Sequence, residues 1–215
     1  MKQVQTRSRG GRPPASRAGE VETRLLDAAG QLFRERGFEL TNCSEVAERA
    51  QAGKASIYTR YANKEALFLA VVEREVTRSA SEDAAISREL PLDARLVEAG
   101  TRILERALDP GAVALLRLLV REGDRFPGLA SHADAIWRQP AVRQATHAIA
   151  LHATRSDDRE RASRVAATFV EHVLLPWQMR ALLGDDLAGH RATTREHVER
   201  TVAMLAAADL LRGFR

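Results

Sequence analysis

Side chains that can bind nucleic acid are grouped in one short stretch of the chain: Lys54, Ser56, Tyr58, Thr59 and Arg60. Ammonium, guanidinium and hydroxyl groups donate hydrogen bonds to the base edges and phosphates of duplex DNA. We expect Lys54, Ser56 and Thr59 to approach base edges, and Tyr58 and Arg60 to contact phosphates. The alternative is that these residues form only the solvated face of a short helix.

The elements around this stretch would hold it against DNA. Residues 42–68 predict two short helices joined by a tight turn, followed by a longer helix that Asn63 caps. Asn42 with Glu45 forms a capping-box pattern at the start of the first helix. A helix-turn-helix needs an apolar underside beneath its second helix. The residues predicted for that underside are Cys43, Val46, Ala47, Ala50, Ala52, Ile57 and Tyr61.

The N-terminal segment separates into an arm and a helix. Residues 1–18 are polar and contain Gly10, Gly11, Pro13 and Pro14, so we predict a disordered arm. Residues 19–36 predict a helix that ends at Gly37. The net charge of +4 lies entirely in residues 1–20, which hold five bases and one acid. A basic arm on a neutral body indicates an anionic partner, unless it is only a solubilising or cloned tail.

The rest of the chain predicts further helices and no strands. An apolar stripe over 92–107 stops at Asp109-Pro110, and a buried helix follows over 112–122. Pro127, Gly128 and Pro140 divide 126–155 into two helical pieces. A long helix is expected over 156–183, with Pro176 kinking it or ending it early. The last helix is expected near 193–211, so the predicted fold class is all-α.

Composition excludes several classes of protein. The single cysteine, Cys43, excludes an internal disulfide and suits the cytoplasm. No apolar run approaches the ~20 residues of a membrane span. The chain has no Gly-rich phosphate loop, nucleophile elbow or paired-cysteine motif, and its histidines lack metal-ligand spacing. We therefore expect no enzyme activity, no catalytic residues, no cofactor, no metal and no membrane contact.

Several motifs together resemble the TetR/AcrR family of bacterial transcriptional regulators. They are GRPPASR in the arm, LLDAAGQLFRERGFE in the first helix and SEVAERA in the second. The last is SIYTRYANKEALF, which begins in the helix expected to enter the DNA groove (the reading helix) and continues beyond it. The resemblance covers about residues 10–75. It implies a disordered basic arm over 1–18, a three-helix helix-turn-helix domain over 19–65, and a larger helical effector-binding and dimerisation domain over 66–215.

The resemblance also assigns DNA contacts to positions of this chain. It places Asn42 and Ser44 at the start of the second helix, near a phosphate and a groove edge respectively. Arg12 resembles arm residues that enter a flanking minor groove. The family's remaining DNA-facing positions correspond here to Lys54, Ala55, Ser56, Tyr58, Thr59, Arg60 and Lys64, the last of these as a phosphate contact.

Three residues depart from the family pattern. Gln51 replaces the usual Gly of the turn, and a left-handed conformation there would cost on the order of 1 kcal/mol. Gly53 replaces the usual Ser or Thr cap and is an acceptable substitute. Arg60 stands where His is common, so the operator sequence does not follow from the family.

The C-terminal domain carries the family's other functions. The resemblance places a homodimer interface on the last two helices, near 158–183 and 193–211. The alanines of the last helix allow close approach, and Val198, Val202 and Leu205 would supply apolar contact. The alternative is that this helix belongs to an intramolecular core. The candidates for contact with a small-molecule effector are Phe126, Trp137, His147, Phe169, His172 and Trp177, each of which is more often ordinary core or surface.

These observations lead to one hypothesis and two alternatives. We expect a cytoplasmic, homodimeric repressor that binds a palindromic double-stranded DNA operator and is released by a small-molecule effector. The first alternative is a ligand-independent activator or architectural DNA-binding protein. The second is a helical enzyme or interaction module that retains a vestigial reading head.

Overall fold

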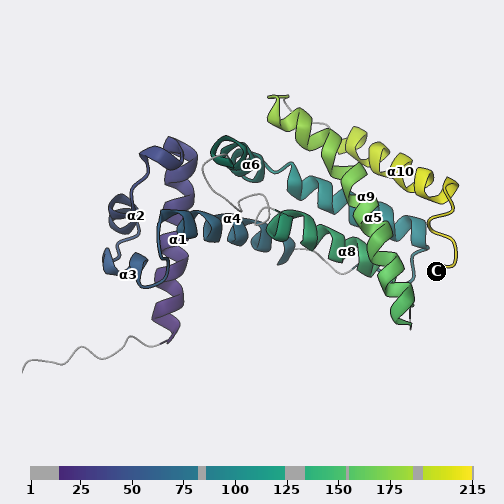
Figure 1. Cartoon of the computed structure of the whole chain (residues 1–215), viewed down its shortest axis with the longest axis horizontal. Helices are drawn as coiled ribbons and strands as arrows, with labels where there is room; N and C mark the ends of the chain where they lie inside the picture. Colours follow the sequence, from purple (N-terminus) through teal and green to yellow (C-terminus); the bar gives the residue numbers. More distant parts are fainter. Residues whose placement is uncertain (1–14, 82–85, 124–133, 154, 186–190, 215) are drawn as a thin grey trace, which may run out of the picture. The chain divides into compact units, whose positions relative to one another are not determined.

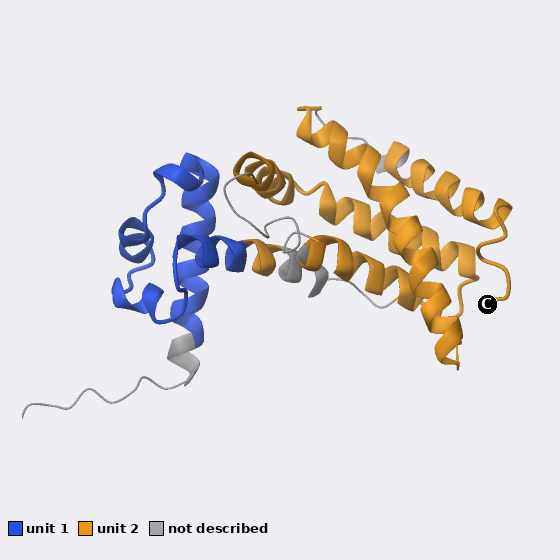
Figure 2. Ribbon diagram, viewed as in Figure 1, with its two compact units in different colours: residues 1–71 blue, residues 72–215 orange. Residues whose placement is uncertain are grey.

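The described residues form helices joined by irregular segments and contain no strand. The computed structural model describes residues 15–81, 86–123, 134–153, 155–185 and 191–214 (Figure 1). The chain divides into two compact units, residues 1–71 and 72–215 (Figure 2). The predicted all-α fold class is confirmed. The boundary between the units lies six residues beyond the predicted boundary at 65/66, which stays a prediction.

Unit 1 begins with a long helix that bends at a glycine. Helix α1 (Ala15–Leu40) starts four residues before the predicted helix and continues past Gly37. Gly37 has φ 78° and ψ 176°, a conformation that residues with a Cβ rarely adopt. The Thr41 hydroxyl donates a 2.8 Å hydrogen bond to the Gly37 carbonyl. The chain therefore turns sharply into the next helix.

Three aromatic rings hold the end of α1 against a later helix. After α2 (Cys43–Arg49) and α3 (Ala55–Tyr58), helix α4 (Lys64–Ser81) begins in unit 1. Phe68 of α4 meets Phe33 and Phe38 edge to face, with ring centroids 5.1 and 5.6 Å apart. All three rings are buried, and such edge-to-face pairs are favourable aromatic geometries. This cluster positions α1 and α4 around the two short helices.

Unit 2 is a helical bundle with its own core. It contains α5 (Leu92–Ala107), α6 (Pro110–Glu122), η2 (Asp134–Arg138), α8 (Gln139–Ile149), α9 (Ser156–Leu182) and α10 (Arg191–Ala207). Helix α5 approaches α9 and α10 closely at Gly100. A Cβ atom at Gly100 would lie 2.6 Å from Phe169 Cζ and 2.7 Å from Val198 Cγ1. Only a residue without a side chain fits this crossing.

Two of the prolines expected to interrupt helices lie within helices of unit 2. Helix α9 continues through Pro176 to Leu182, so the proline does not end it. Pro140 lies in the first turn of α8, where its missing N–H has no partner to lose. No helix among the described residues is long and apolar enough to cross a membrane.

The last helix corrects one sequence-based expectation about the dimer. Val198, Val202 and Leu205 of α10 are at most 4% exposed and belong to the core of unit 2. These three side chains therefore pack inside unit 2 and cannot supply the apolar contact with a partner subunit. Residues buried in a core follow the same apolar spacing as residues buried in an interface, so sequence did not separate the two.

Candidate nucleic-acid interface

The start of α2 combines a cap with an ion pair. Asn42 Oδ1 accepts a 2.9 Å hydrogen bond from the backbone N–H of Glu45, as the capping pattern predicts. The Glu45 carboxylate lies 3.2 Å from Arg36 Nη1 of α1, so it contacts α1 instead of completing the capping box. Asn42 and Ser44 are both exposed. Their side chains are accessible at the N-terminal end of α2, where backbone amides favour an anion.

The turn from α2 to α3 is strained at one residue. Gln51 has φ 52°, a left-handed conformation that costs a residue with a Cβ on the order of 1 kcal/mol. Its N–H bonds the Glu48 carbonyl at 3.0 Å, and the Ala52 N–H bonds the Ala47 carbonyl at 2.9 Å. These two hydrogen bonds close the turn and bring α3 back across α2.

Helix α3 spans four residues, but backbone hydrogen bonds continue its turns from Gly53 to Tyr61. The Ser56 N–H bonds the Gly53 carbonyl at 2.8 Å, and the Tyr61 N–H bonds the Ile57 carbonyl at 2.8 Å. Ile57 and Tyr61 are buried, and the Tyr61 hydroxyl lies 3.2 Å from Glu22 Oε1 of α1. The apolar underside expected of the reading helix is therefore present.

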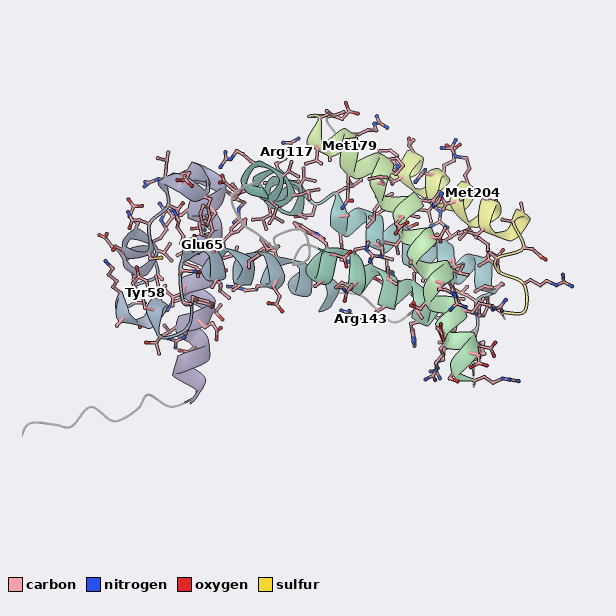
Figure 3. The ribbon with its side chains drawn as sticks, viewed as in Figure 1. Tyr58, Glu65, Arg117, Arg143, Met179 and Met204 are labelled. Carbon is pink, nitrogen blue, oxygen red and sulfur yellow. The ribbon has the colours of Figure 1, made fainter. Side chains whose placement is uncertain are left out.

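The opposite side of α3 faces solvent. Lys54, Ala55, Tyr58 and Thr59 are exposed, Tyr58 by 53% (Figure 3). Ser56 and Arg60 are half-buried, and Arg60 Nη1 donates to the Ser56 carbonyl at 3.0 Å. Lys54 makes no ion pair or hydrogen bond through its side chain with the residues that the structure describes. A mixed surface of ammonium, hydroxyl, methyl and phenol groups is thus available to a ligand.

Tyr58 lies beside the buried Cys43 thiol. Electrostatic interaction with Cys43 raises the pKa of the Tyr58 phenol above its ordinary value, and desolvation adds to the effect. The phenol therefore stays protonated at neutral pH. A protonated phenol can donate a hydrogen bond to a phosphate oxygen.

Lys64 has its ammonium group bonded within unit 1. Lys64 Nζ lies 2.8, 3.3 and 3.0 Å from the carbonyl oxygens of Phe38, Glu39 and Thr41. It also lies 4.3 Å from the centroid of the Phe38 ring. Carbonyls at a helix C-terminus are favourable partners for a cation. The ammonium therefore caps the end of α1, while the Asn63 side chain caps α4 through the Ala66 N–H at 2.8 Å.

The effector candidates do not gather around one site among the described residues. Phe169 and Trp177 are buried in the core of unit 2, whereas His147 and His172 are exposed. Trp137 is half-buried in η2. Phe126 and the arm residue Arg12 lie outside the described residues. The described residues hold no group of three His, Cys, Asp or Glu side chains suited to a metal ion.

Sequence reasoning missed an apolar stripe on the outer side of α9. Leu175, Met179 and Leu183 are 62, 49 and 80% exposed, and Met204 of α10 is 43% exposed; Figure 3 labels the two methionines. The spacing of four residues along α9 places the first three on one face. That spacing was a usable signal, but the core-facing apolar residues of the same helix obscured it.

Comparison with known proteins assigns the helix-turn-helix to a family. Residues 25–71 match the family model described as bacterial regulatory proteins of the tetR family. The matched segment contains α2, α3 and the start of α4. This segment is a TetR-family helix-turn-helix. Two curated relatives of the chain are named as transcriptional regulators, which agrees with the expectation that it is not an enzyme.

Two curated relatives show how far the sequence similarity extends. The HTH-type transcriptional repressor ComR of Escherichia coli (strain K12) is 38% identical over 56 residues, which are 26% of this chain and 27% of ComR. The HTH-type transcriptional activator FasR of Mycolicibacterium smegmatis is 37% identical over 68 residues, which are 32% of this chain and 30% of FasR. The matched part of the chain thus spans less than a third of the length of each of these two relatives.

A solved structure extends the likeness of fold beyond the helix-turn-helix. A putative TetR-family transcriptional regulator from Mesorhizobium loti superposes with a TM-score of 0.70 at 20% identity. The match covers 89% of this chain and 98% of that structure. The likeness of fold to that structure therefore extends over residues of both units.

Proposed function

We propose that this TetR-family chain is a homodimeric regulator that reads a palindromic operator in double-stranded DNA with α3. The observation that carries the proposal is the polar and basic outer face of α3. The buried Ile57 and Tyr61 anchor the opposite side of the helix, so this face points to solvent. A helix supported in this way fits the major groove. The residues proposed to contact DNA are Arg12, Asn42, Ser44, Lys54, Ala55, Ser56, Tyr58, Thr59, Arg60 and Lys64.

The proposed contacts differ in what they do. Tyr58 and Asn42 bind phosphates and set the register of α3, and Ser44 lies near a groove edge. Lys54, Ser56 and Thr59 approach the base edges. Lys64 contributes its backbone N–H in the first turn of α4, because its ammonium group is bonded to the end of α1. Such amides at a helix N-terminus favour a phosphate.

The proposed dimer forms through the outer face of α9 and α10. Leu175, Met179 and Leu183 provide an exposed apolar stripe, and the exposed Ala203 and Ala207 of α10 allow a partner helix to approach. A two-fold axis through this surface makes it self-complementary. The same axis would relate two copies of α3, which is the symmetry that a palindromic operator requires.

Effector release is the further part of this proposal. A small molecule that favours a conformer with wrongly spaced reading heads lowers the affinity for DNA. The support is the resemblance to the family. Among the candidates for contact with the effector, Trp137 is the strongest. It is half-buried, so a small molecule could reach it and still be partly shielded from water. We also propose the cytoplasm as the location, since an operator must be accessible there.

Activation of transcription is the second candidate for the outcome of DNA binding. One relative is named a repressor and the other an activator, and their similarity to this chain lies in the helix-turn-helix. We place repression first because an occupied operator blocks transcription without any further contact. Transcription in vitro from a promoter that carries the operator distinguishes the two by the sign of the effect.

Selection of bound sequences from a random duplex pool tests the DNA-binding proposal. We expect a palindrome with two half-sites and a steep loss of affinity as salt increases, because bound phosphates release counterions. A sequence bound without two-fold symmetry would contradict the dimeric reading mode. Binding that shows neither sequence preference nor salt dependence would favour an interaction module with a vestigial reading head.

A further inference from the structure

The hydroxyl group of Thr59 is occupied by the backbone of its own helix. Thr59 Oγ1 donates a 2.7 Å hydrogen bond to the Ala55 carbonyl, which also accepts the Thr59 N–H at 3.0 Å. A threonine hydroxyl has only one proton to donate. Thr59 therefore cannot donate to a base while this bond is kept, although the residue is exposed.

Besides the acceptor lone pairs of its hydroxyl oxygen, Thr59 can still offer its methyl group to a base. A threonine carries two γ substituents on Cβ, and here the hydroxyl is turned back to the preceding turn. Ala55 lies four residues earlier and is also exposed. Residues four apart are neighbours on one helix face, with Cβ atoms about 5–6 Å apart. Ala55 and Thr59 together form a small apolar patch, which we call the methyl pair.

Thymine is the base that presents a methyl group in the major groove. Its C5-methyl is contacted in protein–DNA complexes by small apolar groups such as those of Ala and Thr. The methyl pair is the apolar part of an otherwise polar face, with Lys54 and Tyr58 as its exposed polar neighbours. Burial of a thymine methyl there removes two apolar surfaces from water.

We propose that Ala55 and Thr59 read the C5-methyl group of a thymine in each operator half-site. This inference rests on the proposed function, because it requires α3 to enter the major groove. It gives Thr59 a role in specificity that depends on its methyl and not on its hydroxyl. It also predicts an A·T pair at the half-site position beneath the methyl pair.

Deoxyuridine substitution isolates the thymine methyl, because uracil lacks only that group. The experiment uses the full chain and a duplex taken from the selected pool. Each half-site thymine is replaced in turn by deoxyuridine, symmetrically in both half-sites, and affinity is measured by fluorescence anisotropy at one salt concentration. At one position we expect affinity to fall by about fourfold per half-site, the value for one buried methyl-sized group. Deoxyuridine in the spacer between half-sites is the control and should leave affinity unchanged.

Two variants of Thr59 then separate its methyl from its hydroxyl. Thr59→Val keeps a methyl and removes the hydroxyl, so the loss caused by deoxyuridine should persist. Thr59→Ser keeps the hydroxyl and removes the methyl, so that loss should fall below twofold. Thermal unfolding of both variants verifies that each is folded.

The outcomes distinguish this inference from the proposed function. Sequence-specific binding that no deoxyuridine substitution weakens would overturn the methyl reading and leave the DNA-binding proposal standing. Persistence of the deoxyuridine effect in Thr59→Ser, with its loss in Thr59→Val, would overturn it by making the hydroxyl the reading group. Failure to bind any duplex would remove the proposed function itself.

Discussion

Lys64 lies beside the proposed DNA-binding surface, but its ammonium group makes a structural contact. Its position at the start of α4 suits a phosphate contact, and the family resemblance implies one. In the structure its ammonium group instead meets three carbonyl oxygens at the end of α1. Lys54, on the outer face of α3, has no such partners among the described residues. The two lysines are therefore expected to act differently.

Replacing Lys64 by Met should destabilise the fold more than it alters the electrostatics of DNA binding. We expect the free energy of unfolding to fall by about 1–2 kcal/mol, because the carbonyls lose a charged donor. The slope of DNA affinity against salt should stay unchanged. Urea unfolding and duplex titration at several salt concentrations measure the two effects.

Lys54→Met is the matched control for Lys64→Met. Lys54 is exposed, so its loss should change the free energy of unfolding by less than about 0.5 kcal/mol while altering the sequence preference for DNA. For Lys64→Met, a salt slope reduced by about one at unchanged stability would place its ammonium on a phosphate instead.

At the scale of elements, the turns from α1 into α2 and from α2 into α3 each depend on an unusual backbone conformation. Gly37 interrupts α1 at φ 78°, and Gln51 closes the next turn at φ 52°. The first site carries the residue that such a conformation favours, and the second does not. The helix-turn-helix unit therefore contains one relaxed turn, at Gly37, and one strained turn, at Gln51.

Gln51→Gly should stabilise the chain. Glycine adopts the left-handed conformation without a Cβ clash, so we expect the free energy of unfolding to rise by about 1 kcal/mol. Gly37→Ala is the opposite change and should lower it by about 1–3 kcal/mol. Denaturant unfolding of both variants tests the pair. A Gln51→Gly variant that is less stable than the natural chain would show that the Gln51 side chain contributes more than its backbone costs.

At the scale of the whole molecule, the proposed assembly depends on a surface that unit 2 does not use for its own core. Leu175, Met179 and Leu183 face away from the buried stripe of α9, which includes Phe169 and Val173. An exposed apolar patch of this kind indicates an interaction site. Charging it should weaken self-association without opening the core.

Leu175→Glu is predicted to convert the proposed dimer into monomers. We expect sedimentation velocity to show the smaller species, and operator affinity to fall because the two half-sites are no longer bound by one linked molecule. The matched control is Val120→Glu on α6, since Val120 and Leu175 are each 62% exposed. Val120→Glu should stay dimeric. A Leu175→Glu variant that remains dimeric with full operator affinity would place the interface elsewhere.

The sequence by itself determined the elements whose signals are local. Asn42 and Asn63 cap their helices as their spacing predicted, and the apolar stripe over 92–107 is α5. The buried positions Ile57 and Tyr61 also followed from the chain. Capping, helical periodicity and turn chemistry act between residues a few positions apart, so they are present in the linear pattern.

Only the tertiary structure decided which partner each of several side chains contacts. Sequence predicted that Val198, Val202 and Leu205 are apolar contacts, but the fold placed them in the core of unit 2 and exposed Leu175 instead. It also placed the Lys64 ammonium on carbonyls more than twenty residues away in the chain. These outcomes depend on how distant helices pack, and an apolar or charged residue has the same local pattern whichever distant surface it meets.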